Sequence, residues 1–309
     1  MLYKQIELIF GAGTADGIED GHVISPTIFA VFDGVSTPYS PKNPKKYYGR
    51  EQLSSGALIV QRTCANIQKT AFGIETRESD VRKIMLQANR AIMDLQQCYD
   101  MPLHDPALLP GATFAVAAIG ESSVDIMQTG DSYAVWQIKN GSCFITKNQL
   151  LEHDVKWGDP IFREIQRKHR KHFSATGNEL EVSEEQLVAA RTATWDEYYD
   201  LWIPKRREDI NNPNSPSGFG LLNGQPEAEG CWFQTSVPRE EINLLILFTD
   251  GLIDYASFKN DGELKEYIIR TYRQNGLRGI LSKKRRWEKL HAKSNYVDQT
   301  EATAIAIEF

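Results

Sequence analysis

The stretch Thr27-Ile-Phe-Ala-Val-Phe-Asp-Gly34 predicts a short buried strand that ends in an acid. Its apolar run, Ile28 to Phe32, has the length of a core strand, and Asp33 follows it directly. Gly34 has no side chain, which suits a place where a charged group approaches the backbone closely. We therefore expect a functional carboxylate at the carboxyl end of this strand.

Two further stretches repeat this arrangement. In Ile242-Asn-Leu-Leu-Ile-Leu-Phe-Thr-Asp-Gly251 an apolar strand again ends in Asp-Gly, at Asp250, and Asp131 follows the alternating run Val124 to Met127. A single acid of this kind is usually a turn residue or a helix cap, since Asp-Gly is a common turn. Three acids at the ends of three strands favour a shared ion or ion pair instead.

Composition and charge limit the class of protein. The chain has 309 residues, is 41% hydrophobic and carries a net charge of −6, which supports a real core and argues against a dedicated nucleic-acid binder. Its four cysteines are scattered without metal-type spacing, as in a reduced interior. The start of the chain lacks a signal-peptide pattern, and the apolar run Phe114 to Ile119 is far shorter than a membrane span. We expect a cytoplasmic protein without nucleic-acid or membrane partners; nothing indicates its oligomeric state.

Helix and strand patterns come in blocks. Apolar residues at helical spacing predict helices at about 50–71 and 78–99, after a Pro-, Lys- and Tyr-rich loop at 36–49. Strands are predicted at 4–10, 111–119, 123–127, 133–138 and 143–146. A run of strands after a run of helices favours an α+β fold with antiparallel sheets flanked by helices.

The segment from about 150 to 230 has a different character. Asp159-Pro160 predicts the start of a basic helix that includes Arg163 to Lys171, and Ser183 with Gln186 predicts the start of another helix. We expect this segment to be an insertion within a single domain of residues 1–309. The sheet pattern then resumes, with helices at about 261–274 and 277–291 and a last strand at 302–309.

Five acids are candidates for one site: Glu19, Asp33, Asp131, Asp250 and Asp298. Carboxylates without a partnering group of His or Cys suit Mg²⁺ or Mn²⁺. A calcium or structural site is the alternative, but the compact loop of alternating acids that it needs is absent from the sequence. A carboxylate that bridges two such ions is the arrangement that activates water against a phosphate ester.

The order of six short motifs resembles the metal-dependent protein phosphatases of type 2C, the PPM family. The motifs are Glu19-Asp20, Ile28 to Gly34, Gly111-Ala-Thr113, Gly130-Asp-Ser132, Phe248-Thr-Asp-Gly251 and Asp298. The resemblance covers nearly the whole chain, although 150–230 matches only loosely. It implies an α/β/β/α sandwich with a flap in that segment. It also implies a bacterial-type serine/threonine phosphatase, with phosphoproteins as substrates.

The resemblance assigns roles as well. It implies metal ligands at Glu19, Asp33, the Gly34 carbonyl, Asp131, Asp250 and Asp298. Asp33 would bridge two Mg²⁺ or Mn²⁺ ions, and Asp131 and Asp250 would share a third ion found in many bacterial members. Asp33 and Asp250 are then the acids at the catalytic centre.

Three positions depart from the family pattern. Ala15 stands where members often carry a phosphate-binding Arg, and Val35 stands where many eukaryotic members carry His. Asp298 lies further than usual from Thr303, which makes Glu301 a rival ligand.

A phosphate dianion that approaches five carboxylates needs cationic help beyond the metals, or it binds weakly. We expect Arg50, or one of the loop lysines Lys42, Lys45 and Lys46, to provide it, and the basic helix from Arg163 to Lys171 to select the substrate. The alternative is that these cations are solvated surface and the metals alone hold the phosphate. The competing functions are a pseudophosphatase that only binds its partners and a phosphatase of small molecules.

Overall fold

The computed structural model describes residues 2–14, 17–39, 44–73, 80–158, 160–161, 163–165, 167, 184–291 and 299–309. Asp298, Lys42, Ala15 and much of the predicted basic helix, including Lys168 to Lys171, lie outside these residues. Within them, two five-stranded antiparallel sheets pack face to face.

The first sheet has the strand order β1-β12-β11-β8-β9. Its strands are β1 (Gln5–Gly11), β12 (Ala302–Glu308), β11 (Ile242–Phe248), β8 (Tyr133–Ile138) and β9 (Cys143–Ile145). The second sheet has the order β10-β7-β6-β3-β2. Its strands are β10 (Phe233–Pro238), β7 (Ser123–Thr129), β6 (Gly111–Ile119), β3 (Ile28–Val35) and β2 (Gly21–Ile24).

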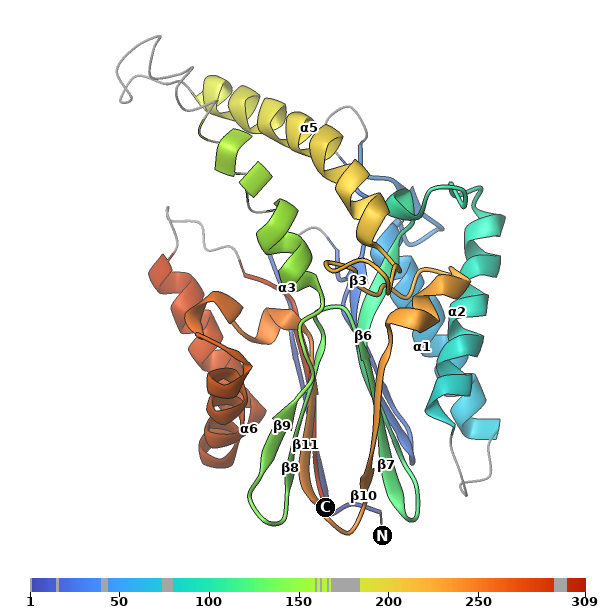
Figure 1. The fold of residues 1–309 in the computed structure, drawn as a ribbon, viewed down its shortest axis with the longest axis vertical. Helices are drawn as coiled ribbons and strands as arrows, with labels where there is room; N and C mark the ends of the chain where they lie inside the picture. The colour runs from blue at the N-terminus through green and yellow to red at the C-terminus, as the bar shows by residue number, and fades with distance from the viewer. Residues whose placement is uncertain are drawn as a thin grey trace.

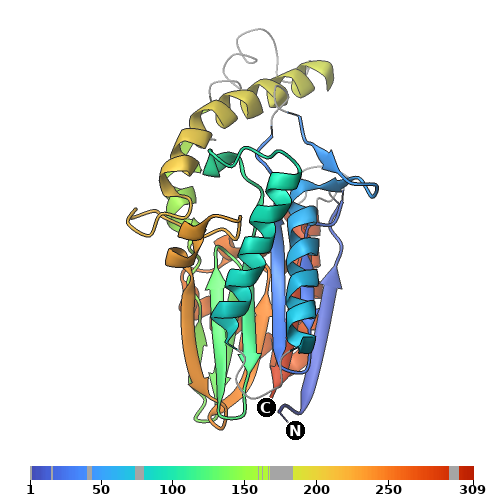
Figure 2. The ribbon, with the colours of Figure 1, turned by 90° about the vertical axis from the view of Figure 1, so that its right-hand side faces the viewer.

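Helices cover the outer face of each sheet. Helix α6 (Asp261–His291) lies on the first sheet, and α1 (Ser55–Gly73) and α2 (Val81–Cys98) lie side by side on the second (Figures 1 and 2). The order of layers is therefore helix, sheet, sheet, helix. This confirms the predicted fold class.

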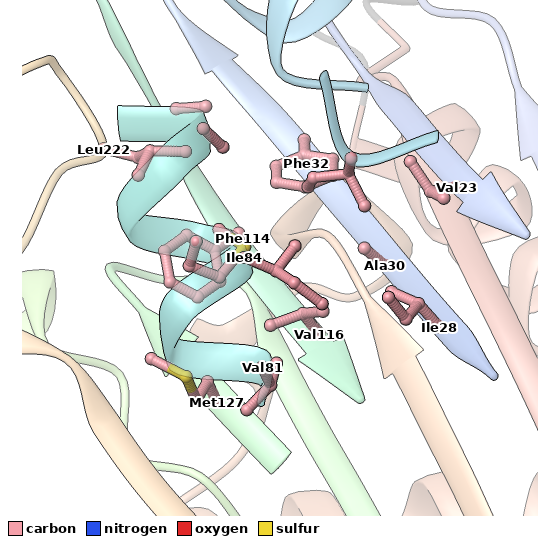
Figure 3. Close-up of a cluster of buried hydrophobic side chains, with 14 of the residues drawn as sticks. Val23, Ile28, Ala30, Phe32, Val81, Ile84, Phe114, Val116, Met127 and Leu222 are labelled. Atoms are coloured by element: carbon pink, nitrogen blue, oxygen red, sulfur yellow. The ribbon is translucent and has the colours of Figure 1, made fainter. Parts of the chain in front are cut away.

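Buried apolar side chains explain why these layers hold together. Phe29 and Ile305 belong to the cluster between the two sheets. Phe32 and Phe114 belong to the cluster beneath α1 and α2, where side chains of α2, β3 and β6 meet (Figure 3). Both of these phenylalanines are fully buried, and each such side chain stabilises the fold by about 2–3 kcal/mol. Beneath α6, Phe248 lies in a third cluster.

The strands that carry the predicted acids all run toward one end of the sandwich. Strands β3, β7 and β11 finish there, and the two ends of the chain lie at the opposite end (Figure 1). We call the first the acid end and the second the far end. Among the described residues, no helix has both the length and the apolarity needed to cross a membrane.

The segment between β9 and β10 also lies at the acid end (Figure 1). Its described elements are α3 (Leu150–His153), the π-helical turn η2 (Asp154–Gly158), α5 (Glu184–Asp209) and the 3₁₀ helix η4 (Pro226–Cys231). Whether 150–230 forms an insertion within one domain stays a prediction.

The structure differs from the predicted elements in two places. Asp33 and Gly34 do not end β3 but lie inside it, paired with Thr113 and Ala112 of β6. A small hairpin of β4 (Tyr47–Tyr48) and β5 (Leu53–Ser54) extends from the predicted loop toward α1. The two predicted C-terminal helices are both present: they form the two parts of α6, which meet at Gly276, where the backbone is not helical and φ is +65°.

Candidate active site

Four aspartates converge at the acid end. Asp33 comes from β3, Asp250 from the turn after β11 and Asp131 from the turn between β7 and β8. The carboxyl groups of Asp33 and Asp250 share a hydrogen bond, and the charges of Asp20 and Asp131 also act on Asp33. The structure thus brings together three of the predicted site residues, Asp33, Asp131 and Asp250, and adds Asp20.

Crowding makes these carboxyl groups hard to ionise. Desolvation by the surrounding protein, followed by the negative charges of Asp250, Asp20 and Asp131, raises the pKa of Asp33 well above its usual range. Desolvation and Asp250 together raise the pKa of Asp131 to about 8. Desolvation also raises the pKa of Asp250, although its hydrogen bond with Asp33 and the charge of Lys284 oppose the rise.

Asp20 is a site residue that sequence reasoning did not assign. Its side chain is only 8% exposed, and the Thr249 hydroxyl donates to its Oδ2 at 2.9 Å. Burial, opposed by hydrogen bonds from Thr303 and Thr249, raises the pKa of Asp20 to about 7. The sequence signal for Asp20 was weak, because Glu19 and Asp20 are adjacent acids and the sequence does not tell which of the two side chains faces the aspartate cluster.

Glu19 lies at the edge of this cluster. The Ser36 hydroxyl donates to its Oε1 at 2.6 Å, and the Lys45 ammonium lies 3.3 Å from the same oxygen. Both partners come from the segment that follows Gly34. The predicted ligand Glu19 is thus held by a hydroxyl and a cation from one loop.

Both Asp-Gly pairs are explained by close approach of the chain to itself. A Cβ at Gly34 would lie 2.6 Å from the Glu19 carbonyl oxygen, and one at Gly251 would lie 1.5 Å from the Glu301 carbonyl oxygen. Any side chain at either position would push these segments apart. The group that approaches Gly34 and Gly251 here is another backbone segment, which brings Glu19 and Glu301 next to the aspartates.

Glu301 fixes the loop that carries Glu19 and Asp20. Its Oε2 accepts hydrogen bonds from the backbone N–H groups of both residues, each at 2.8 Å. The neighbouring Thr300 is held by Glu288, which accepts from its N–H and hydroxyl at 3.2 and 3.0 Å. Glu301 therefore already has two donors on one oxygen. Its rival as the last ligand, Asp298, lies outside the described residues.

Helix α6 contributes cations to this edge. The side chain of Lys284 is 9% exposed, lies 3.6 Å from Glu288 and lowers the pKa of Asp250 by its charge. Arg285 donates to the Thr300 carbonyl at 2.7 Å and contacts the Gly11 carbonyl at 3.4 Å. These cations join α6 to the segments on either side of the acids.

The expected phosphate-binding residues lie in different surroundings. Lys45 is beside Glu19, whereas Lys46 and Arg50 are exposed on the β4–β5 hairpin. In the described part of the basic helix, Arg167 pairs with Glu164. Lys45 is therefore the loop cation in direct contact with a predicted metal ligand.

A second cluster of buried polar side chains lies at the C-terminal end of α5. His153 Nδ1 is 2.9 Å from Asp209 Oδ2, and their side chains are only 1% and 4% exposed. The hydroxyls of Ser215 and Ser217 donate to the same carboxylate at 2.5 and 2.8 Å. The buried Arg206 contacts the Ala107 carbonyl through Nε at 3.3 Å. These bonds join the C-terminal end of α5 to α3 and to the core.

The chemistry of the acids fits divalent cations. A group of carboxylates whose pKa values rise together is one whose repulsion an ion would relieve, and hard oxygen ligands suit Mg²⁺ or Mn²⁺. Among the described residues, which leave out Asp298, no three His, Cys, Asp or Glu side chains are already placed to hold an ion.

Solved structures resemble this chain over nearly its whole length, although a scan against protein-family models and a comparison with curated proteins find no match. The serine/threonine phosphatase Stp1 from Staphylococcus aureus has a TM-score of 0.53 at 15% identity, covering 99% of this chain and 94% of that one. The catalytic domain of the phosphatase PstP, in complex with two manganese ions, has a TM-score of 0.51 at 12% identity, covering 98% and 97%.

A third structure is the PPM Ser-Thr phosphatase MsPP from Mycobacterium smegmatis, in complex with cacodylate. It has a TM-score of 0.50 at 13% identity and covers 99% of each chain. At these identities the likeness shows a shared fold. This chain therefore has the fold of bacterial PPM serine/threonine phosphatases.

Proposed function

We propose that this protein is a metal-dependent phosphatase of the PPM type that hydrolyses phosphoserine and phosphothreonine in proteins. The observation that carries the proposal is the convergence of Asp20, Asp33, Asp131 and Asp250 at one end of a fold shared with bacterial serine/threonine phosphatases.

The manganese ions of PstP support Mg²⁺ or Mn²⁺ as the cofactor. In the proposal, Glu19, Asp33, the Gly34 carbonyl, Asp131, Asp250 and Asp298 would hold two or three such ions, with Asp33 as the shared ligand. When bound, these ions supply the charge that activates water and neutralises the phosphate.

The chain's own groups prepare this centre. Ser36 and Glu301 fix the position of Glu19, the first through its carboxylate and the second through its backbone. Asp33 and Asp250, whose pKa values are both raised by burial, are the carboxyl groups between which a cation would be held. Lys45 is the proposed phosphate-binding residue in place of the Arg that Ala15 replaces. Its ammonium lies 3.3 Å from the carboxylate of Glu19, at the edge of the acids.

The proposal is tested with Asp33→Asn, which keeps the shape of the side chain and removes its charge. We expect wild type to hydrolyse p-nitrophenyl phosphate only with Mn²⁺ or Mg²⁺, and the variant to show no measurable turnover. Asp125→Asn on β7 is the matched control, because Asp125 lies on the same sheet away from the acid end.

Thermal unfolding supplies a second measurement. An ion that binds only the folded state stabilises it by about 2.7 kcal/mol when its free concentration is a hundred times Kd. Mn²⁺ should raise the melting temperature of wild type and of Asp125→Asn much more than that of Asp33→Asn. Normal turnover by Asp33→Asn would place the centre elsewhere. If Mn²⁺ stabilises wild type but no substrate is turned over, the protein is a pseudophosphatase that only binds its partners.

A further inference from the structure

A group of tyrosines and cations flanks the candidate active site. It consists of the exposed Tyr39, Lys46, Tyr47 and Arg50 together with the half-buried Lys45, and we call it the Tyr–Lys surface. Tyr39 is 55% exposed and Tyr47 is 47% exposed. Large aromatic side chains that remain open to solvent next to cations are common at binding surfaces.

One side of the β4–β5 hairpin packs on the core and so fixes the position of the Tyr–Lys surface. Tyr48, next to Tyr47, packs on the cluster of Leu58, Met101 and Leu109, and its ring meets that of Tyr99 edge to face at 5.3 Å. Successive residues of a strand point to opposite faces, so Tyr47 faces away from this cluster. The anchored Tyr48 thus holds Tyr47 at the surface.

The surface is locally basic although the chain as a whole is acidic. The whole chain has a net charge of −6, yet the hairpin segment 44–52 carries Lys45, Lys46 and Arg50 against one acid, Glu51. Within the described residues, Lys46 and Arg50 have no hydrogen bond or ion pair from their side chains. Two unpaired cations beside exposed rings complement a ligand that is acidic and partly apolar.

The surface is continuous with the acids. Lys45 lies 3.3 Å from Glu19, and its ammonium lies 5.7 Å from the centre of the Tyr39 ring. Tyr47 follows two residues later. A peptide whose phosphorylated residue enters the aspartate cluster would therefore place its neighbouring residues along the hairpin.

We propose that the Tyr–Lys surface binds the segment of a phosphoprotein substrate that flanks the phosphorylated residue, and that it selects segments rich in Asp and Glu. This inference rests on the proposed phosphatase function for its substrate. It assigns substrate selection to the β4–β5 hairpin, in addition to the segment 150–230.

The test compares two phosphoserine peptides that differ only in flanking residues, Glu in one and Gln in the other. Exposed ion pairs each contribute about 0.2–1 kcal/mol, so several together should give wild type a preference of about tenfold in kcat/KM for the acidic peptide. Lys46→Ala with Tyr47→Ala should reduce this preference to about twofold. Lys139→Ala, an exposed lysine in the far-end turn after β8, is the matched control and should keep it.

Peptide-binding measurements test the Tyr–Lys surface independently of the proposed phosphatase activity. Fluorescence anisotropy of labelled peptides measures Kd whether or not turnover occurs, and the preference should weaken as salt screens the cations. Equal Kd values for the two peptides, or equally tight binding of single-stranded DNA, would overturn the proposal. Selective binding without hydrolysis would support the surface while contradicting the phosphatase function.

Discussion

Asp209 offers a direct test of how the segment between β9 and β10 is attached to the core. Its carboxylate accepts from His153 Nδ1, Ser215 Oγ and Ser217 Oγ at 2.9, 2.5 and 2.8 Å. We predict that Asp209→Ala leaves these donors without their acceptor in a site where Asp209 is only 4% exposed.

The size of the effect follows from those three bonds. A hydrogen bond to a charged group contributes about 1.5–3 kcal/mol, but the two hydroxyls can turn toward other acceptors or water, so the losses do not add fully. We expect Asp209→Ala to lower the free energy of unfolding by about 4 kcal/mol. Asp209→Asn keeps the shape and one acceptor oxygen and should cost about half as much.

Urea unfolding followed by tryptophan fluorescence measures both variants, because Trp202 lies close to His153, with ring centres 6.2 Å apart. Hydrogen exchange across α5 tells local opening from global unfolding. A loss below about 1 kcal/mol for Asp209→Ala, with unchanged exchange in α5, would refute the view that this cluster attaches the segment.

Two further predictions concern Glu301 and His153. Glu301→Ala should lower the free energy of unfolding by about 2 kcal/mol in urea, because two backbone N–H groups lose their acceptor. It should reduce Mn²⁺-dependent turnover only in part, because Glu301 positions Glu19 through the backbone and Ser36 still holds the Glu19 carboxylate, whereas Asp298→Ala should remove turnover. The reverse pattern of turnover would make Glu301 the ligand. Burial lowers the pKa of His153, so the unfolded chain takes up its proton first. This contribution to stability is complete above about pH 6.5 and declines below it, and His153→Gln should flatten that decline; an unchanged pH profile would contradict the assignment.

The sheets were predictable because their signal is local. Asp33, Asp131 and Asp250 each follow an apolar run, and such runs must lie in a core whatever their partners are. Antiparallel pairing then places the ends of β3, β7 and β11 together. The order of short motifs resembles that of the PPM family, and this resemblance predicted the two-sheet sandwich that the structure confirms.

What the sequence could not supply depends on distant partners. Lys284 and Arg285 lie in a pattern typical of a solvated helix, and only the fold brings the carbonyls of Gly11 and Thr300 to Arg285. Asp20 is buried by Thr249, which is remote in the chain. The β4–β5 hairpin was missed because a pair of two-residue strands leaves almost no periodic signal in a Pro- and Lys-rich stretch.

The two ends of the sandwich differ in how they can tolerate change in chain length. The turn at the far end between β8 and β9, at Asn140-Gly141, is short, while the β4–β5 hairpin and the described elements between β9 and β10 lie at the acid end. An insertion in a long connection would reshape what a partner meets without altering the pairing of β3 with β6. Changes in the length of these connections would therefore alter which partner the protein recognises while the carboxylates on the strands keep their positions.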